Sequence, residues 1–452
     1  MKLNLRSCGT AALATLSVVA AGIAAPASAG EDPTLSEIVN ILHEKGLIDD
    51  EEHEALAAKA TKEQAKRSWT DRIAVFGDLR GRVEAFEYEQ DSATEAAGGR
   101  LQDRVRGRYR ARLGVNAKVV SRASVTLGLN TNGADPRSGN QTLGSGNDFD
   151  KDEFRLDLAY ATLSPFADGV LPGIDNGYLA FDFGKVKNPF LWKALGVDNL
   201  LFDNDINPEG ANLRITGGAG PLTLFANGGV YVIDENSAAK DPKMLGGQLG
   251  GAVKIADHVS LGARGSLFHF FSLDDAFFAR AACDNGGPGC ATDPGGTGGN
   301  IVDGLSHGSI QVAETSMFLD LGVIEWLPML VYGTYAHNLS ALSSLVSDAD
   351  REDDAWTAGI FLGDKVRLVR VGFAYYYIEA NAFPSMYIDS DVLDGTPNRR
   401  GFMVSLERQL FENVDLALRG FSSDNIESGA AFVNSVPGSD RLRGQADVTV
   451  KF

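Results

Sequence analysis

RVRGRYRARLGVNA, residues 104–117, is the stretch that decides the fold of this chain. Successive side chains of a β-strand point to opposite faces, and here the odd positions carry Val105, Leu113 and other mostly apolar groups. A soluble β-sandwich would have to bury one of the two faces, and buried charges need partners. A water-filled lumen on one side and lipid on the other satisfies both faces. The stretch therefore predicts a transmembrane β-strand whose lumen face carries five arginines, Arg104, Arg106, Arg108, Arg110 and Arg112.

The segment before this strand has the same period of two. Within residues 72–87, Leu79 and Val83 share one face while Arg80 and Arg82 share the other. Alternation of this kind is typical of a strand with one wet and one apolar face. We therefore expect this segment to be the first strand of the barrel and to place its arginines in the lumen.

The C-terminal segment repeats the pattern and ends on an aromatic residue. Residues 439–452 set apolar side chains opposite Arg441, Arg443 and Lys451, and the last residue is Phe452. A terminal aromatic after an alternating strand resembles the recognition signal that the barrel-assembly machinery reads. We expect this strand to close against the first one, with its basic side chains next to Arg80 and Arg82, and Phe452 to serve as the assembly signal.

Between these ends the pattern predicts sixteen strands, an even number as in single-chain bacterial barrels. Short turns, such as those near Ala219 and Glu412, alternate with long polar loops, as expected for periplasmic turns and external loops. The fold class is thus an all-β transmembrane antiparallel barrel. The expected strands are residues 72–87, 102–119, 122–132, 153–164, 176–186, 211–217, 221–233, 244–256, 258–272, 309–323, 328–340, 353–363, 365–380, 398–409, 413–424 and 439–452.

The N-terminus reads as a secretory signal followed by a short helical segment. Residues 1–29 combine a basic start, an Ala-rich apolar run over 11–25 and an Ala-Ser-Ala cleavage site. Residues 30–70 predict a periplasmic helical segment with a second helix beginning at Asp49, which leaves residues 71–452 for the barrel. No later stretch has roughly 18 consecutive apolar residues, so any membrane role rests on strands.

The net charge and the cysteines indicate which ligands the chain is not expected to bind and whether it is cross-linked. The formal net charge of −19 argues against a nucleic-acid binder. Between residues 31 and 66 there are ten acidic side chains against four basic ones, so much of the acidity lies outside the predicted strands. Cys283 and Cys290 have six residues between them in a Gly-rich loop and predict a small disulfide in an oxidising compartment. A metal pair is the alternative, but His and Cys partners are missing at ligand spacing, and no cofactor is expected.

Several of these segments resemble one bacterial family. They are the helical segment 35–47, FGDLRGRVE (76–84), RGRYRARLGVNAKV (106–119), FGKVKNPF (183–190), LFDNDINPEGA (201–211) and the terminal Phe. The chain resembles the Putative porin family and, more distantly, the phosphate-selective porins. The resemblance implies an outer-membrane diffusion channel for small hydrophilic solutes or ions, embedded in lipid and trimeric if it follows porins generally.

In general porins the third external loop folds into the lumen and narrows it. Here that loop spans residues 187–210, and acids on it would face the arginines of the first two strands, with Lys185 beside them. Opposed acidic and basic groups in a constriction set ion selectivity, and the excess of arginine predicts a mild anion preference. The alternative is that the arginines pair with carboxylates on neighbouring strands and only keep the lumen wet. The expected constriction residues are Arg80, Arg82, Arg104, Arg106, Arg108, Arg110, Arg112, Lys185, Asp198, Asp203, Asp205 and Glu209.

Two sharper chemical hypotheses have weaker support. Asp203, Asp205 and Asn207 resemble the start of a Ca²⁺ loop, but Pro208 and Arg214 stand where that motif needs Gly and a bidentate Glu. A hydrolase would need a nucleophile beside a histidine, and the best histidine, His269, lies in an aromatic run typical of a membrane-interface girdle.

Two other classes of protein remain open at this point. A structural or adhesive envelope barrel could be tethered through its N-terminal helices, with an incidental lumen. A soluble secreted all-β protein could place its arginine faces in open solvent.

Overall fold

The computed structural model describes residues 42–45, 47–50, 52–57, 59, 72–90, 103–131, 136–144, 149, 151–192, 200–235, 237, 240–273, 308–324, 326–340, 352–395, 397–426 and 439–452. The predicted signal peptide, Asp198 and the predicted disulfide between Cys283 and Cys290 lie outside these residues. The chain divides into two units, Met1–Asp71 and Arg72–Phe452. Among the described residues, no helix is both long enough and apolar enough to cross a membrane.

In the first unit, residues 42–44, 50, 52–57 and 59 are helical. The second helix begins with a reciprocal capping arrangement. Glu52 N donates to Asp49 Oδ1 at 2.8 Å, and Asp49 N donates back to Glu52 Oε2 at 3.3 Å. Two otherwise unpaired backbone donors are satisfied in this way, which fixes the helix start at Asp49.

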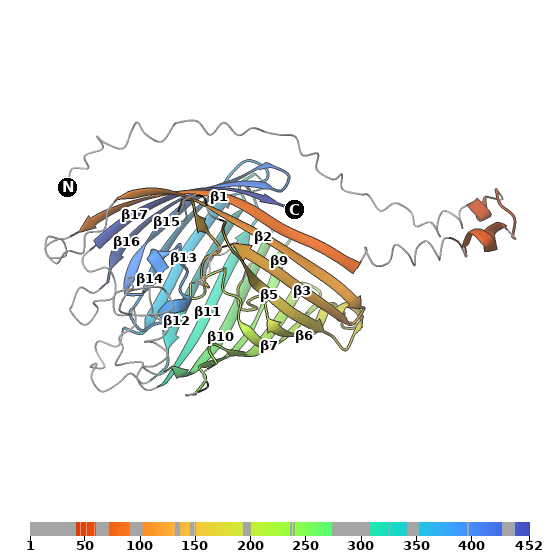
Figure 1. Cartoon of the computed structure of the whole chain (residues 1–452), viewed down its shortest axis with the longest axis horizontal. Helices are drawn as coiled ribbons and strands as arrows, with labels where there is room; N and C mark the ends of the chain where they lie inside the picture. The colour runs from red at the N-terminus through yellow and green to blue at the C-terminus, as the bar shows by residue number, and fades with distance from the viewer. Residues whose placement is uncertain are drawn as a thin grey trace. The chain divides into compact units, whose positions relative to one another are not determined.

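The second unit is an antiparallel sheet closed on itself (Figure 1). Each long strand pairs with its neighbours in sequence, and β1 pairs with both β2 and β17. Of the seventeen strands, β4 has only two residues and lies against β2, which leaves sixteen in the wall. The strands are β1 (Ile73–Gln90), β2 (Arg104–Val120), β3 (Ala123–Thr131), β4 (Gln141–Thr142), β5 (Phe154–Leu163), β6 (Asp175–Lys185), β7 (Glu209–Ala219), β8 (Leu222–Val232), β9 (Lys243–Ala256), β10 (Val259–Leu273), β11 (Gly308–Leu321), β12 (Met329–Asn338), β13 (Asp354–Gly363), β14 (Arg370–Ile378), β15 (Arg399–Phe411), β16 (Val414–Asn425) and β17 (Ser439–Lys451).

The predicted barrel of sixteen strands is therefore confirmed, with two local corrections. Strand β4 was not expected. The strand expected from residue 365 begins instead at Arg370, because Asp364 starts a turn. The side-chain Oδ1 of Asp364 accepts a hydrogen bond from Val366 N at 2.8 Å, and the Asp364 carbonyl accepts one from Leu368 N at 3.0 Å. Local side-chain bonds of this kind compete with a sheet ladder.

The two faces of the wall divide as the alternation predicts. On β1, Leu79 and Val83 are 52% and 47% exposed on the outside, whereas Arg82 and Glu84 are 3% and 0% exposed on the inside. The outer surface is thus apolar and the inner surface of this part of the wall is charged. A one-residue shift of register would exchange the two faces, so the pattern and the register support each other.

The lumen also contains an apolar core, which the sequence did not predict. Phe268 and Phe270 of β10 point inward and are 1% and 0% exposed. They contact two connecting segments that fold into the barrel, one carrying Phe202 and the other Phe383. The Phe202 ring lies 5.2 Å from Phe268 and 5.0 Å from Phe383, edge to face in both pairs. Aromatic packing of this geometry anchors both segments against the wall.

Candidate functional site

The lumen faces of β1, β2 and β17 form a continuous basic surface. Because side chains alternate, the even-numbered residues of β1 and β2 lie on the same face, and the register sets Arg80 opposite Arg110 and Arg82 opposite Arg108. Like charges directly opposite each other on neighbouring strands repel, so this surface requires counter-ions. We call it the arginine wall; it consists of Arg80, Arg82, Arg106, Arg108, Arg110, Arg112 and Arg443.

Glu84 is the counter-ion at one end of the arginine wall. Its carboxylate is fully buried and accepts from Arg443 Nη2 at 2.8 Å and from Arg106 Nε at 2.6 Å. Arg82 Nη1 lies 3.2 Å and Arg108 Nη1 3.8 Å from the same group. One buried carboxylate therefore balances part of the charge of four guanidinium groups across three strands.

The third loop, residues 186–192 and 200–208, supplies a second counter-ion from inside the lumen. Arg112 Nη2 donates to Asp205 Oδ1 at 2.5 Å, and Arg110 Nη1 lies 3.6 Å from the same oxygen. Burial alone would raise the pKa of Asp205, but the guanidinium groups of Arg112, Arg110 and Arg80 lower it to about 2. Asp205 thus remains charged at any ordinary pH and ties the loop to β2.

The seventh loop, residues 379–395 and 397–398, approaches the arginine wall from the other side. Its Asp391 lies 2.8 Å from Arg82 Nη1 and 2.7 Å from Arg443 Nη2. Burial opposes ionisation of Asp391, but the two guanidinium groups and that of Arg80 hold its pKa well below the ordinary value of 3.8. The seventh loop was not among the predicted constriction residues, although the alternating acids of Asp389-Ser390-Asp391 in a long external loop were an available signal.

Asp203 joins the two loops to each other rather than to the arginines. Its Oδ2 accepts from Ser390 N at 2.8 Å, and its own backbone N donates to Tyr387 O at 2.8 Å. Burial, followed by the charges of Asp389 and Asp205, raises the pKa of Asp203 well above its ordinary value. Asp203 therefore serves mainly to hold the two loops together.

Three of the expected constriction residues have contacts outside the arginine wall and its counter-ions. Lys185 and Glu209 pair with each other at 3.0 Å where β6 ends and β7 begins. Arg104 is exposed and its guanidinium stacks on Phe86, 5.1 Å from the ring centre.

The three side chains of the calcium hypothesis have different partners in the structure. Asp203 accepts backbone N–H groups and Asp205 pairs with Arg112, while Asn207 Nδ2 donates to Asp157 Oδ1 at 2.9 Å. No common cage of oxygen ligands is formed by these residues.

The placement of the C-terminal basic residues also needs correction. The register sets Arg82 opposite Asp447, Phe86 opposite Arg443 and Asp78 opposite Lys451. Lys451 Nζ consequently reaches Asp415 on β16, at 2.7 Å. Of the three basic residues expected beside Arg80 and Arg82, Arg443 alone joins the arginine wall, through its shared contact with Asp391.

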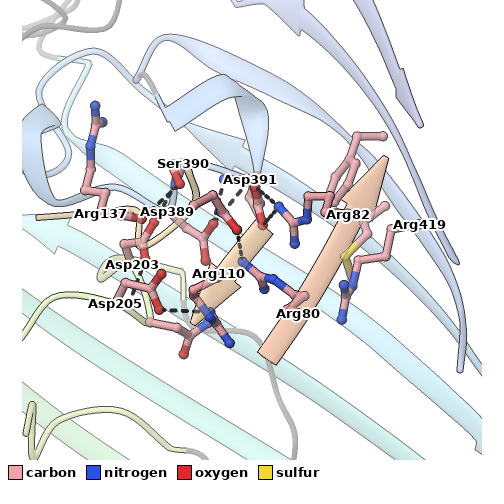
Figure 2. Close-up of a pocket in the computed structure, with 15 residues that line it drawn as sticks. Arg80, Arg82, Arg110, Arg137, Asp203, Asp205, Asp389, Ser390, Asp391 and Arg419 are labelled. Atoms are coloured by element: carbon pink, nitrogen blue, oxygen red, sulfur yellow. Dashed lines mark hydrogen bonds and ion pairs between the residues drawn. The ribbon is translucent and has the colours of Figure 1, made fainter. Parts of the chain in front are cut away.

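A polar cavity of about 130 Å³ lies between the arginine wall and the two loops. Figure 2 shows Arg80, Arg82 and Arg110 reaching toward the aspartates of the two loops. Its charged lining residues are five arginines and four aspartates: Arg80, Arg82, Arg110, Arg137, Arg419, Asp203, Asp205, Asp389 and Asp391.

Comparison with known families assigns the chain. A profile described as Putative porin matches residues 48–294, more than half of the sequence. The chain belongs to the Putative porin family. Comparison of this porin with curated proteins found no match. Family membership makes it an outer-membrane channel for passive diffusion in a Gram-negative bacterium, and the soluble secreted alternative is wrong.

Three solved structures resemble the fold of this porin. The high-pH structure of Pseudomonas putida OprB has 10% identity and a TM-score of 0.49, covering 86% of this chain and 96% of that one. The outer membrane channel DcaP of Acinetobacter baumannii has 13% identity and a TM-score of 0.43, covering 84% of this chain and 97% of that one. A triple mutant of the Rhodopseudomonas blastica porin has 12% identity and a TM-score of 0.41, covering 84% of this chain and 100% of that one. Likeness at this level says nothing about the solute of this porin.

Two histidines of this porin, the hydrolase candidate His269 and His337, have neighbouring partners. His269 stacks on Phe271, with ring centres 3.8 Å apart, and lies 3.3 Å from Gln311 Nε2, as expected for a residue in an aromatic girdle. Among the described residues, His337, Asp353 and Asp354 form a group whose ligand atoms lie within 4.8 Å of one another. In that group, His337 Nδ1 lies 2.7 Å from Asp354 Oδ1, so the imidazole already has a carboxylate partner.

Proposed function

We propose that solutes cross this porin between the arginine wall and the two inserted loops, and that the passage mildly prefers anions. The observation that carries the proposal is the balance of charge at the cavity, which is lined by five arginines and four aspartates. Fixed charges that line a narrow lumen set ion selectivity, because low-dielectric walls concentrate their field.

The net charge of −19 for the whole chain does not oppose this preference. Ten acidic side chains lie between residues 31 and 66, outside the barrel unit. At physiological salt, fields are largely screened beyond about 8–10 Å. An ion in the lumen therefore responds most strongly to charges within about this distance, such as those that line the cavity.

The triple substitution Arg106→Gln, Arg108→Gln and Arg110→Gln should shift the reversal potential toward cations. It removes three positive charges and leaves Glu84, Asp78 and Asp205 with fewer partners. The measurement is the reversal potential of purified protein in a planar bilayer under a KCl gradient.

A matched triple removes the same charge away from the cavity: Arg122→Gln, Arg155→Gln and Lys254→Gln, all at exposed positions. We expect this control to keep the wild-type reversal potential. A wild type that is strongly cation-selective, or equal shifts in both triples, would show that the arginine wall does not filter ions.

We further propose that Phe452 is the assembly signal and that the assembled porin is a homotrimer. Phe452 N donates to Gly77 O at 3.1 Å, and Gly77 N donates to Phe452 O at 3.0 Å, so the last residue extends the β1–β17 seam. The ring is 63% exposed on the outer side and covers Gly77, where an added Cβ would lie 2.5 Å from Phe452 Cζ. The oligomeric state rests on the likeness to porins, and light scattering of the detergent-solubilised protein tests it.

Phe452→Asp should lower the amount of folded, heat-modifiable porin in the outer membrane several-fold. A charge near the membrane interface costs only about 1 kcal/mol, so a large loss would come from recognition by the assembly machinery. Phe411→Asp is the control, because Phe411 is 72% exposed and precedes the short β15–β16 turn. Equal losses in the two variants would reduce the role of Phe452 to surface hydrophobicity.

A further inference from the structure

Arg80 differs from its neighbours on the arginine wall in having no carboxylate partner among the described residues. Arg82 is paired with Asp447 and Asp391, and Arg110 with Asp78. The one hydrogen bond of the Arg80 guanidinium runs from Nη2 to the neutral Asn140 Oδ1, at 2.5 Å. Arg80 Nε is buried and has no hydrogen-bond partner.

A half-buried guanidinium that no carboxylate contacts directly among the described residues is incompletely neutralised, although Asp205 and Asp391 act on it at longer range. Arginine stays protonated in proteins, so Arg80 cannot escape the penalty by losing its proton. The charge is partly taken out of water, and its nearest opposite neighbour in the sheet register is Arg110, which repels it. The surroundings of Arg80 therefore favour the entry of a negative group.

The cavity beside Arg80 has both room and a second donor for such a group. A single water requires only about 10–15 Å³, so the cavity of about 130 Å³ is large enough for a small anion. Arg110 Nη1 lies on the same cavity, 3.6 Å from Asp205 and so beyond hydrogen-bonding distance. Figure 2 shows Arg80 and Arg110 extending side by side between the aspartates of the two loops.

We propose that this cavity binds one small oxyanion, a phosphate or the carboxylate group of an organic acid, through the guanidinium groups of Arg80 and Arg110. The planar guanidinium presents paired donors that match two oxygens of such a group, which a chloride ion does not offer. The nearby acids Asp205, Asp389 and Asp391 limit the affinity, so that the anion can leave again, as conduction requires. This inference rests on the proposed function and adds a saturable site to a general preference for anions.

The test is single-channel recording in KCl at constant ionic strength, with chloride replaced stepwise by inorganic phosphate in one series and by acetate in another. The occupied site should reduce the chloride current in a saturable manner. Hydrogen bonds to charged groups contribute about 1.5–3 kcal/mol, so Arg80→Gln should raise the half-saturating concentration about 10- to 100-fold. Arg80→Lys keeps the charge without the paired donors and should give a smaller increase.

The control variant is Arg370→Gln, which removes an arginine from β14, where it pairs with Glu407 outside the cavity. Its half-saturating concentration should equal that of the wild type, and heat-modifiable mobility confirms that each variant is folded. Saturation by both anions supports a general oxyanion site, and saturation by one of them assigns the site to that anion.

A wild-type current without saturation, or an Arg80→Gln variant with unchanged saturation, would overturn the site. The reversal potential in KCl alone separates the two proposals. An anion-selective wild type without saturation refutes only the site, whereas a cation-selective wild type refutes the proposed function.

Discussion

Glu84→Gln should destabilise the barrel by about 3–5 kcal/mol, the range found when one partner of a buried ion pair is removed. Glu84 is fully buried, and four guanidinium groups lie within 3.8 Å of its carboxylate. Glutamine retains the size of the side chain but cannot balance their charge. The measurement is reversible urea unfolding in lipid vesicles, followed by tryptophan fluorescence and heat-modifiable mobility.

Glu153→Gln serves as the control for this substitution. The Glu153 side chain is 68% exposed and pairs with Arg155 at 2.9 Å. Exposed ion pairs contribute at most about 1 kcal/mol, so the control should unfold nearly as the wild type does. A Glu84→Gln variant that loses less than about 3 kcal/mol of stability would show that water or rearranged side chains already solvate the arginines.

A second substitution identifies the source of the loss. Arg443 forms the closest contact between β17 and Glu84, and it also reaches Asp391. If the cost in Glu84→Gln arises from uncompensated positive charge, adding Arg443→Gln should recover part of the stability. Residues in contact commonly show coupling energies of about 0.5–3 kcal/mol, which the double-mutant cycle measures directly.

The sequence could predict the two faces of the wall because the period of a strand is fixed by its backbone. Arg82 and Val83 must point in opposite directions in any extended strand, and only a lumen accommodates one such face and lipid the other. The number of strands followed from counting these alternating segments. None of this required knowledge of which segments meet in space.

Features that depend on contacts between segments distant in the sequence could not be predicted. Phe268, His269, Phe270 and Phe271 are apolar or aromatic on both faces, so alternation cannot tell which ring enters the lumen. The contact between Arg82 and Asp391 joins residues 309 positions apart. The β1–β17 register, and not composition, decides that Lys451 reaches Asp415 instead of the arginine wall.

Loop docking explains how charge and pore size are connected in this porin. The seventh loop is held on one side by packing of Phe383 against Phe202, and on the other by the contact of Asp391 with Arg82 and Arg443. The apolar contacts fix where the loop lies. We expect the ionic contacts to set how closely the loop approaches the arginine wall.

Asp391→Asn should release the seventh loop from the arginine wall, widen the passage and strengthen the preference for anions. The Asp391 side chain is 28% exposed, so we expect the lower end of the range for a broken buried pair, about 3 kcal/mol. That corresponds to a change of about 10²-fold in the equilibrium between docked and released loop. Single-channel conductance should rise, and the reversal potential should shift toward anions because Arg82 and Arg443 lose a counter-ion.

Acid should imitate the substitution, because the pKa of Asp391 is lowered in the folded protein. The contribution of a group with a lowered pKa is complete above its ordinary value, here 3.8, and is lost as the pH falls toward the folded value. Wild-type conductance should therefore stay constant from neutral pH down to about 4 and rise below it. Asp320→Asn is the control, since Asp320 is an exposed carboxylate on β11 that is not among the residues lining the cavity. Wild-type conductance and selectivity in Asp391→Asn would show that the aromatic contacts of Phe383 suffice to hold the loop, leaving Asp391 as a counter-ion without a gating role.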